Sequence, residues 1–313
     1  MTESSRARSI GLLPWLALVV VYLLWSSTYL ANRFLITTVP PLLAGGWRFL
    51  VGGALLAVVV LALAGRGAFR MSRAQLGTVV LSGLLLPAWG NGLVAIGQQA
   101  VASGLTALLI AAVPLWIVVL RAATGDRPRV TTVGGVAVGV VGLAVLVLAG
   151  PASGGVAGTA WWGPWTVLLA SLGWAIGTFA TARLPVPANP FALAAVQMLV
   201  GGVILLAVGT AAGERLDLAA IAPASWWAWG YLAVIVSLMA FSAYAYALST
   251  LPVSTVATYA YVNPVLAVLL GVVVAGERFS GVQLVGGAVV LLAVVLVIAA
   301  ERNRQGSVAP SRP

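Results

Sequence analysis

The sequence has no cysteine, no histidine and no lysine, and only six of its 313 residues are acidic. The absence of cysteine excludes disulfides and thiolate metal ligands. The absence of histidine and the scarcity of carboxylates leave little for metal binding or general acid–base catalysis. We therefore expect no metal and no cofactor, and we expect the protein not to be an enzyme.

Charged residues make up only 7% of the chain, whereas 62% of it is hydrophobic and the mean hydropathy is +1.10. A water-soluble domain needs a largely polar surface and cannot bury so much apolar side chain. Runs of about 20 apolar residues, the length that crosses roughly 30 Å of hydrocarbon, recur along the whole chain. The sequence therefore predicts an all-α integral membrane protein, with the lipid bilayer as its surroundings.

Gly, Pro, Arg and polar clusters divide the apolar sequence into ten predicted membrane-spanning helices. The first apolar run is too long for the core of a cleaved signal peptide, and no small-residue cleavage site ends it, so we expect it to be retained. Residues 301–313 are polar and are expected to form a disordered tail. The predicted helices cover residues 11–31, 42–63, 75–96, 104–121, 130–149, 162–182, 190–212, 225–248, 254–275 and 280–299.

The net charge of +10 comes from 16 arginines, which lie singly between apolar runs. This placement is typical of topology signals and predicts no nucleic-acid partner. If the N-terminus is cytoplasmic, twelve arginines lie inside and four lie outside, namely Arg33, Arg48, Arg215 and Arg278. Cytoplasmic segments are enriched in basic residues, so both termini are predicted to be cytoplasmic.

The two halves of the chain carry similar sequences. PLLAGGWRFLVGGALL at residues 41–56 matches PFALAAVQMLVGGVIL at residues 190–205 in six of sixteen positions. Further matches follow in the same order, Trp25 with Trp174, Pro114 with Pro264, and GGVAV at Gly134 with GGAVV at Gly286. Chance matches are the alternative in so biased a composition. We predict repeats at residues 1–150 and 151–300; five helices each would make them inverted, an arrangement typical of transporters.

Polar side chains within the predicted spans are candidate solute contacts, because they are costly in hydrocarbon. The candidates are Asn91 and Asn263, for which helix packing is the alternative, and Thr178, whose hydroxyl could instead bond to the i−4 carbonyl of its own helix. Pro114 and Pro264 occupy matching places in the two halves and are predicted to kink their helices and free backbone carbonyls at the repeat interface, although a purely structural kink is equally compatible.

Aromatic residues away from the span ends form the second set of candidates. Trp25 and Tyr29 are spaced i, i+4, as are Trp174 and Thr178, and Tyr259 and Asn263, so each pair shares a helix face. Aromatic walls hold apolar side chains and attract cations, while packing between helices is the competing role. The predicted solute-binding aromatics are Trp25, Tyr29, Trp89, Trp116, Trp174, Tyr244 and Tyr259.

Two charged positions are assigned structural roles. Arg48 opens the second span and is expected to extend toward the lipid headgroups. Glu277 and Arg278 follow the ninth span and are expected to form a solvated turn rather than a gate. No acidic residue lies well inside a predicted span, so the chain lacks an intramembrane group that could carry protons. We therefore expect facilitated movement of the solute and no proton coupling. Glycine pairs, among them Gly52–Gly53 and Gly201–Gly202, predict close helix approach.

Particular motifs add a family resemblance over nearly the whole chain. WSSTYLANRF with PPLLAGGWRF, AYAYVNPVLAVLLG, and the GER turn at Gly276 are similar to the EamA-type transporters of the drug/metabolite transporter superfamily, in particular inner-membrane exporters of the YedA/YddG kind. The resemblance implies ten helices in two inverted repeats, the bacterial inner membrane, and export of amino acids or related metabolites. The family pattern WGS reads Trp25–Ser26–Ser27 here.

These observations favour a monomeric carrier that exports amino acids, aromatic or otherwise neutral, or related small metabolites by alternating access. An exporter of drugs or hydrophobic cations with the same fold is the alternative substrate class. A passive channel is disfavoured by the aromatic, sparsely polar interior. A membrane-embedded enzyme is disfavoured because no nucleophile lies beside a base.

Overall fold

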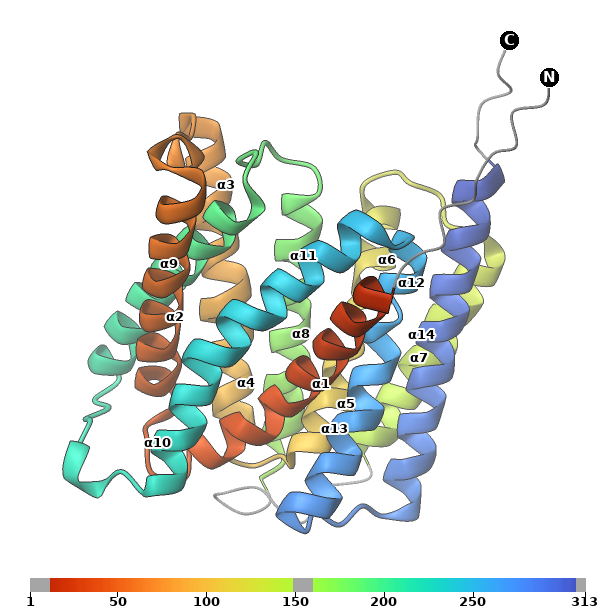
Figure 1. Cartoon of the computed structure of the whole chain (residues 1–313). Coiled ribbons are helices and arrows are strands. Elements are labelled where there is room, and N and C mark those ends of the chain that lie inside the picture. Colours follow the sequence, from red (N-terminus) through yellow and green to blue (C-terminus); the bar gives the residue numbers. More distant parts are fainter. Residues whose placement is uncertain (1–11, 149–159, 308–313) are drawn as a thin grey trace, which may run out of the picture.

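The computed structural model describes residues 12–148 and 160–307, and throughout these ranges it contains helices and no strand (Figure 1). Each predicted span coincides with one helix or a run of helices. The first half comprises α1 Leu12–Leu35, α2 Pro41–Ala64, η1 Arg66–Phe69, α3 Arg73–Gly83, η2 Leu84–Asn91, α4 Gly92–Gly97, α5 Ser103–Ile110, α6 Val113–Ala123 and α7 Val130–Leu148. The second half comprises α8 Trp162–Thr181, α9 Pro190–Ala211, η3 Leu218–Ala220, α10 Pro223–Gly230, η4 Tyr231–Ala240, α11 Phe241–Thr250, α12 Val253–Val256, α13 Tyr259–Ala275 and α14 Gly281–Ser307.

Eight helical segments of the described chain are long and apolar enough to cross a bilayer. The helix over Tyr259–Ala275 is apolar but shorter than these, and α8 is not among the eight. The helix α14 continues to Ser307, seven residues into the predicted disordered tail. The N-terminal residues 1–11 and the remainder of the tail lie outside the described residues.

Successive spans alternate in direction, so that α1 begins and α14 ends at the same, upper end of the bundle in Figure 1. We call the opposite end, which carries residues 36–40, 98–102, 212–222 and 276–280, the lower end. Residues 65–72, 124–129 and 182–189 connect helices at the upper end. The short connections between successive spans make neighbouring spans antiparallel.

The packing relates the two halves of the chain to each other. The helices α2 and α9 pack along each other, as do α7 and α14. The helix α1 packs against α10, η4, α11 and α13, and α8 packs in the corresponding way against α3, η2, α4, α5 and α6. The first helix of each half therefore lies among the third and fourth spans of the other half.

Glycines make the two symmetric contacts close, as predicted. A side chain at Gly202 would collide with the backbone of Gly46 and Leu50, so α2 and α9 touch almost backbone to backbone. At the other contact, a side chain at Gly142 would collide with Val290 of α14. Small residues allow this approach in membrane helices, where close packing replaces the hydrophobic effect.

The backbone repeats its irregular features in both halves. The third span of each half contains a π-helical stretch, η2 in the first and η4 in the second. Among the described residues, the glycines with positive φ are Gly65, Gly125, Gly213 and Gly276, which end the second and fourth spans of each half. Glycine is favoured there because other residues are strained in the left-handed conformation. Duplicated irregularities of this kind are stronger evidence of a repeat than matching Val and Leu.

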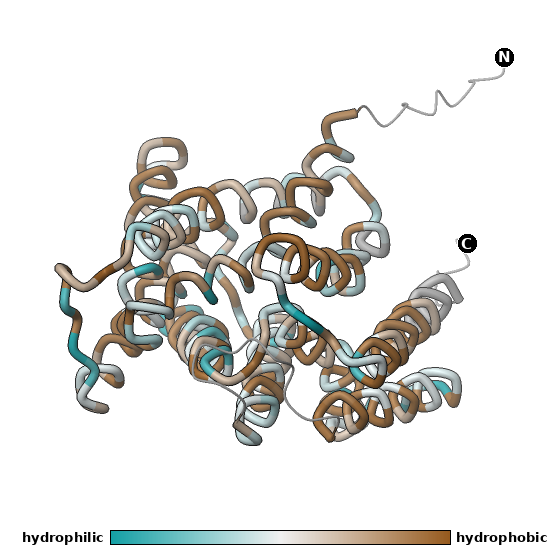
Figure 2. The backbone as a smooth tube through the Cα atoms, turned by 90° about the horizontal axis from the view of Figure 1, so that it is seen from below, coloured by the Kyte–Doolittle hydropathy of each residue, from teal (hydrophilic) through white to brown (hydrophobic). Residues whose placement is uncertain are grey.

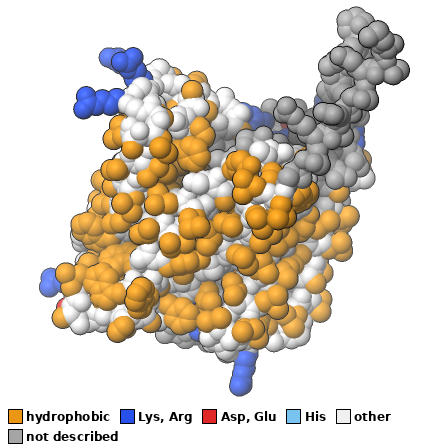
Figure 3. All heavy atoms as spheres, viewed as in Figure 1, with side chains coloured by type: hydrophobic (Ala, Val, Ile, Leu, Met, Phe, Trp, Pro, Cys, Tyr) orange, Lys and Arg blue, Asp and Glu red, His pale blue; other side chains and the backbone are white. Residues whose placement is uncertain are grey.

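The exterior is that of a membrane protein. In Figure 3 hydrophobic side chains cover the visible side of the bundle, and basic side chains project near its ends. Seen from below, in Figure 2, the helices are predominantly hydrophobic and hydrophilic residues gather in connecting segments.

Candidate functional site

An aromatic cluster joins three helices from the two halves of the chain. Trp25 of α1 has its ring centroid 4.9 Å from that of Tyr244 in α11 and 4.8 Å from that of Tyr259 in α13. The two tyrosine rings are 5.8 Å apart and nearly perpendicular. Edge-to-face pairs of this kind are favourable and present both ring faces and hydroxyls to their surroundings. The structure thus brings together three of the predicted aromatic residues.

Polar side chains bind α1 to α13 next to this cluster. The Ser26 hydroxyl donates to Asn263 Oδ1 at 3.3 Å, and both side chains are buried. One turn away, the hydroxyls of Tyr22 and Thr258 are hydrogen-bonded to each other. Tyr29, one turn beyond Trp25, is half-buried, and its carbonyl accepts from Gln98 Nε2. Asn263 therefore lies at the predicted place beside the aromatic residues.

A second aromatic group surrounds α8 and consists of the remaining predicted tryptophans. Trp174 packs on Gly90 of η2, while Trp89 of η2 packs on Gly173 of α8. Trp89 Nε1 donates to the Leu169 carbonyl, and Trp116 Nε1 donates to Ser171 Oγ at 2.9 Å. The predicted aromatic residues thus divide into two groups, one around α1 and one around α8, the first helices of the two halves.

The two other predicted polar contacts, Asn91 and Thr178, make no hydrogen bond to another helix in the described structure. Asn91 Nδ2 donates to the carbonyl of Leu86 on its own helix, 3.1 Å away, which satisfies the amide within η2. The side chain of Thr178 is exposed. Both positions lie on helices of the second aromatic group, Asn91 on η2 and Thr178 on α8.

The predicted kinks differ between the halves. In the first half the helix stops after Ile110 and resumes at Val113, so Pro114 lies in the first turn of α6, where its missing N–H costs nothing. In the second half the break lies at Ala257–Thr258, and Pro264 is inside α13. Both fourth spans are interrupted, but only the first interruption adjoins its proline.

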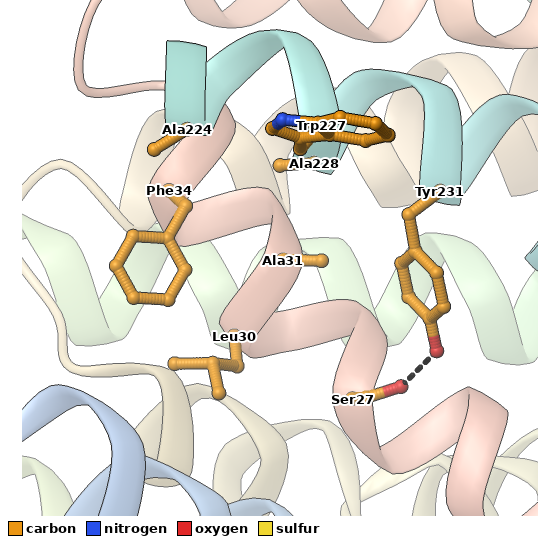
Figure 4. Close-up of a pocket in the computed structure, with 8 residues that line it drawn as sticks. All are labelled: Ser27, Leu30, Ala31, Phe34, Ala224, Trp227, Ala228 and Tyr231. Atoms are coloured by element: carbon orange, nitrogen blue, oxygen red, sulfur yellow. Dashed lines mark hydrogen bonds between the residues drawn. The ribbon is translucent and has the colours of Figure 1, made fainter. Parts of the chain in front are cut away.

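A groove of about 400 Å³ lies between α1 and the α10–η4 segment (Figure 4). Its lining is almost wholly apolar, and Ser27 and Tyr231 use their hydroxyls on each other at 2.6 Å. Trp227, on its wall, is 82% exposed. A zwitterion needs unengaged polar groups, which this lining lacks, so the groove is a poorer candidate than the aromatic cluster.

The expectation for Glu277 is wrong. The residue is buried, and its carboxylate is paired with Arg33 of α1. It also accepts from the N–H groups of Ser103 and Gly104 at 2.8 and 3.0 Å, and from the Ser103 hydroxyl at 2.7 Å. Gly276 turns the chain back at the end of α13, so the carboxylate reaches the N-terminus of α5, where the helix dipole favours a negative charge.

The expectation for Arg48 is also wrong. Its side chain is buried among helices, with its guanidinium carbon 4.9 Å from the centre of the Phe49 ring. A chain that extends to the headgroups would be exposed at the end of its helix. The glycines along α2 let α9 and η4 approach so closely that the arginine is enclosed.

Sequence reasoning missed two buried amides at the lower end. Asn32 Nδ2 of α1 donates to Gln98 Oε1 at 2.6 Å, and Gln98 in turn reaches back to α1. The sequence could have indicated this pair, because both amide side chains lie at the edges of apolar runs, where each needs a hydrogen-bond partner. No group of three or more acidic residues that could hold a metal is present in the part of the chain that the structure describes.

A helical bundle with apolar flanks, a duplicated backbone and polar groups confined to its interior and ends is a polytopic membrane protein of the transporter class. The EamA-like transporter family matches residues 12–148 and again residues 161–299. The chain belongs to this family.

Individual relatives agree with that assignment. The chain is 37% identical over 282 residues to the uncharacterized inner membrane transporter YedA of Escherichia coli, covering 90% of this chain and 89% of the relative. It is 26% identical to a WAT1-related chloroplastic protein of Arabidopsis thaliana, over 93% and 70% of the two chains. It is 29% identical to a probable terminal-alkyne amino-acid exporter of Streptantibioticus cattleyicolor, over 64% and 66%.

A solved crystal structure matches with a TM-score of 0.62 at 22% identity, over 92% of this chain and 98% of the other, which supports the fold. The family resemblance and the bacterial inner-membrane, multi-pass localisation inferred from the sequence are confirmed. Because the family and the Escherichia coli relative YedA are transporters, the comparisons point away from an enzyme.

Proposed function

We propose that the protein exports amino acids, aromatic or otherwise neutral, or related small metabolites by alternating access. The observation that carries this proposal is the cluster of Trp25, Tyr244 and Tyr259, which combines residues of both halves. Motion of one half against the other would open and close such a cluster, whereas a site within one half would move as a body. The amino-acid exporter among the relatives supports this substrate class.

The lower end supports alternating access as the mechanism. Glu277 joins α13, α1 and α5, the Asn32–Gln98 pair adds a second tie, and Thr38 donates to Ser225 of α10 at 2.9 Å. We propose that this network closes the lower end in the described conformation. Its groups exchange partners only if α1 separates from α5 and α13, as opening requires.

We propose facilitated movement even though Glu277 is buried. The carboxylate is paired with Arg33 and accepts from three further donors, so its charge is compensated where it lies. It serves as a tie between helices instead of a carrier of protons. Export then follows the solute's own gradient, and we propose a monomer because the two halves already pack on each other within one chain.

The test is counterflow in proteoliposomes. Vesicles preloaded with unlabelled phenylalanine should take up labelled phenylalanine faster than empty ones, with saturation, because a carrier exchanges solute across the membrane. Equal rates in loaded and empty vesicles would indicate a channel. Concentrative uptake that collapses with a protonophore would overturn facilitated movement, and exchange of tetraphenylphosphonium instead of phenylalanine would favour the hydrophobic-cation alternative.

The ten-span inverted topology is tested separately, using the absence of cysteine. Single cysteines in 122–128 should react with an impermeant maleimide only from the cytoplasmic side, and cysteines in 213–217 only from outside. Cysteines in 302–313 should match the first group. Labelling of both groups from one side would contradict the ten-span topology.

A further inference from the structure

Among the residues that the structure describes, Arg48 is the one basic residue that is buried, and no carboxylate there pairs with it. Its relative exposure is 8%, and Nε is enclosed without a hydrogen-bond acceptor. Its cation–π partner is the neighbouring Phe49. By contrast, Arg33 and Arg121 are each paired with a carboxylate, and Arg183 is exposed. An unpaired charge within a membrane helix is costly and marks a functional position.

The duplication provides an internal comparison for this position. Gln197 of α9 occupies the place that corresponds to Arg48, and its amide donates to Ser82 Oγ at 2.7 Å. At this position α9 therefore carries a neutral, hydrogen-bonded side chain. Packing between α2 and α9 does not require a cation at the related position of α2, so the charge of Arg48 needs its own explanation.

Arg48 is buried on α2, the helix that packs against both π-helical stretches. Arg48 shares a helix face with Gly52, which packs on Ser237 of η4. The Phe49 ring that the guanidinium covers belongs to an apolar cluster with Ala88 of η2. One turn before Arg48, Ala44 belongs to the apolar cluster against which Trp25 packs. The charge is thus on the side of α2 that leads to the aromatic residues.

We propose that Arg48 binds the carboxylate of the transported solute. A guanidinium presents a planar fork of N–H donors that matches a carboxylate in two parallel hydrogen bonds. An organic anion would neutralise the buried charge and supply the acceptors that the described residues do not. The inference rests on the proposed export function and narrows it to carboxylate-bearing solutes, which excludes purely cationic ones.

Binding is measured by thermal unfolding of the purified full chain in neutral detergent, with solutes matched in shape. Phenylalanine and 3-phenylpropionate carry the carboxylate, while their amides do not. Wild-type protein should bind the acids about tenfold more tightly than the amides. Arg48→Gln, which copies Gln197, should lose this preference, and Arg48→Lys should retain part of it. Arg183→Gln, which removes an exposed arginine, should behave as wild type.

The outcomes separate the two proposals. If phenylalanine does not exchange in proteoliposomes but phenylpropionate still stabilises wild type and not Arg48→Gln, the export function is wrong and the carboxylate site stands. Equal binding of acids and amides by wild type, or an unchanged preference in Arg48→Gln, overturns the site. Should Arg48→Gln fail to fold, the wild-type comparison and Arg48→Lys decide. Stabilisation by chloride or phosphatidylglycerol alone, without competition from the acids, also overturns it.

Discussion

The two ends of the molecule use the same turn for different purposes. At the lower end, the sequence AGER occurs twice, and in each copy a glutamate after a left-handed glycine reaches the N-terminus of a first-half helix. Glu277 accepts from Ser103 and Gly104, and Glu214 accepts from Leu42 and Leu43 at 3.2 and 2.8 Å. At the upper end, Asp126, in the place that corresponds to Glu277, pairs with Arg121 of the preceding helix, α6.

This difference shows that a shared local sequence decides how a helix ends but not what the end is attached to. Gly125 and Gly276 both adopt positive φ, and each is followed by an acidic residue. At the lower end that acid joins helices that are far apart in the sequence. Under the proposed alternating access, the ties made by Glu214 and Glu277 would hold the lower end closed.

The largest effect is expected for Glu277→Gln. Removing one partner of a buried ion pair leaves the other charge uncompensated, at a cost of about 3 kcal/mol, and the tie to α5 is also weakened. We expect a clear fall in melting temperature and loss of most counterflow. Glu214→Gln, which breaks a cap without an ion pair among the described residues, should cost about 1 kcal/mol. Equal losses in both variants would remove the distinction between the two turns.

The ion pair itself is isolated by a double-mutant cycle. Arg33→Gln with Glu277→Gln should be more stable than the sum of the single changes predicts, because each single variant leaves one charge unpaired. Thermal unfolding of the four proteins gives the coupling free energy. Strict additivity would mean that Glu277 acts through α5 alone.

A smaller and more selective effect is expected for the two related tryptophans. Trp25→Ala should reduce counterflow about tenfold with little change in melting temperature, because the residue contacts other aromatic side chains at the proposed site. Trp174→Ala should lower the melting temperature more, since Trp174 fills the space over Gly90. Transport rates and unfolding curves of the two variants test this. The reverse pattern would place the solute site around α8.

The smallest effects are expected for the glycines. Gly213→Ala and Gly276→Ala each force a side chain into the left-handed conformation, which costs about 1 kcal/mol. Because the two turns share this requirement, similar shifts in melting temperature are expected. A much larger loss of transport for Gly276→Ala than for Gly213→Ala would sharpen the comparison. It would show that transport depends on the direction in which Gly276 points the Glu277 carboxylate, in addition to the ending of α13.

The sequence contained most of the fold because hydrocarbon imposes simple rules on it. Span length, arginine placement and glycine pairs are each dictated by the bilayer, and the predicted boundaries lie within a few residues of the helices except at the end of α14. The π-helical stretches could not be foreseen. Neither Pro87 in η2 nor any residue of η4 distinguishes a π-helix from an ordinary helix in sequence.

The site was harder to predict, because it depends on which faces meet. The sequence placed all the candidate aromatic residues in one set, and it could not separate the tryptophans around α8 from the cluster of Trp25, Tyr244 and Tyr259. Glu277 was assigned to water because it follows a span, although the same position lets it reach the start of another helix. Arg48 was expected at the headgroups, since the closeness of α9 and η4 is a property of the packed structure.

The glutamate caps also have a consequence for biogenesis. The amides of Leu42 and Leu43 are 172 and 171 residues from Glu214, and those of Ser103 and Gly104 are 174 and 173 residues from Glu277. During synthesis the first half therefore enters the membrane before its glutamate caps exist. Until then, water at the lower surface must accept the hydrogen bonds of these amides. The caps on the earlier helices form only after α9 and then α13 have been inserted, so the two halves are joined at a late stage of synthesis.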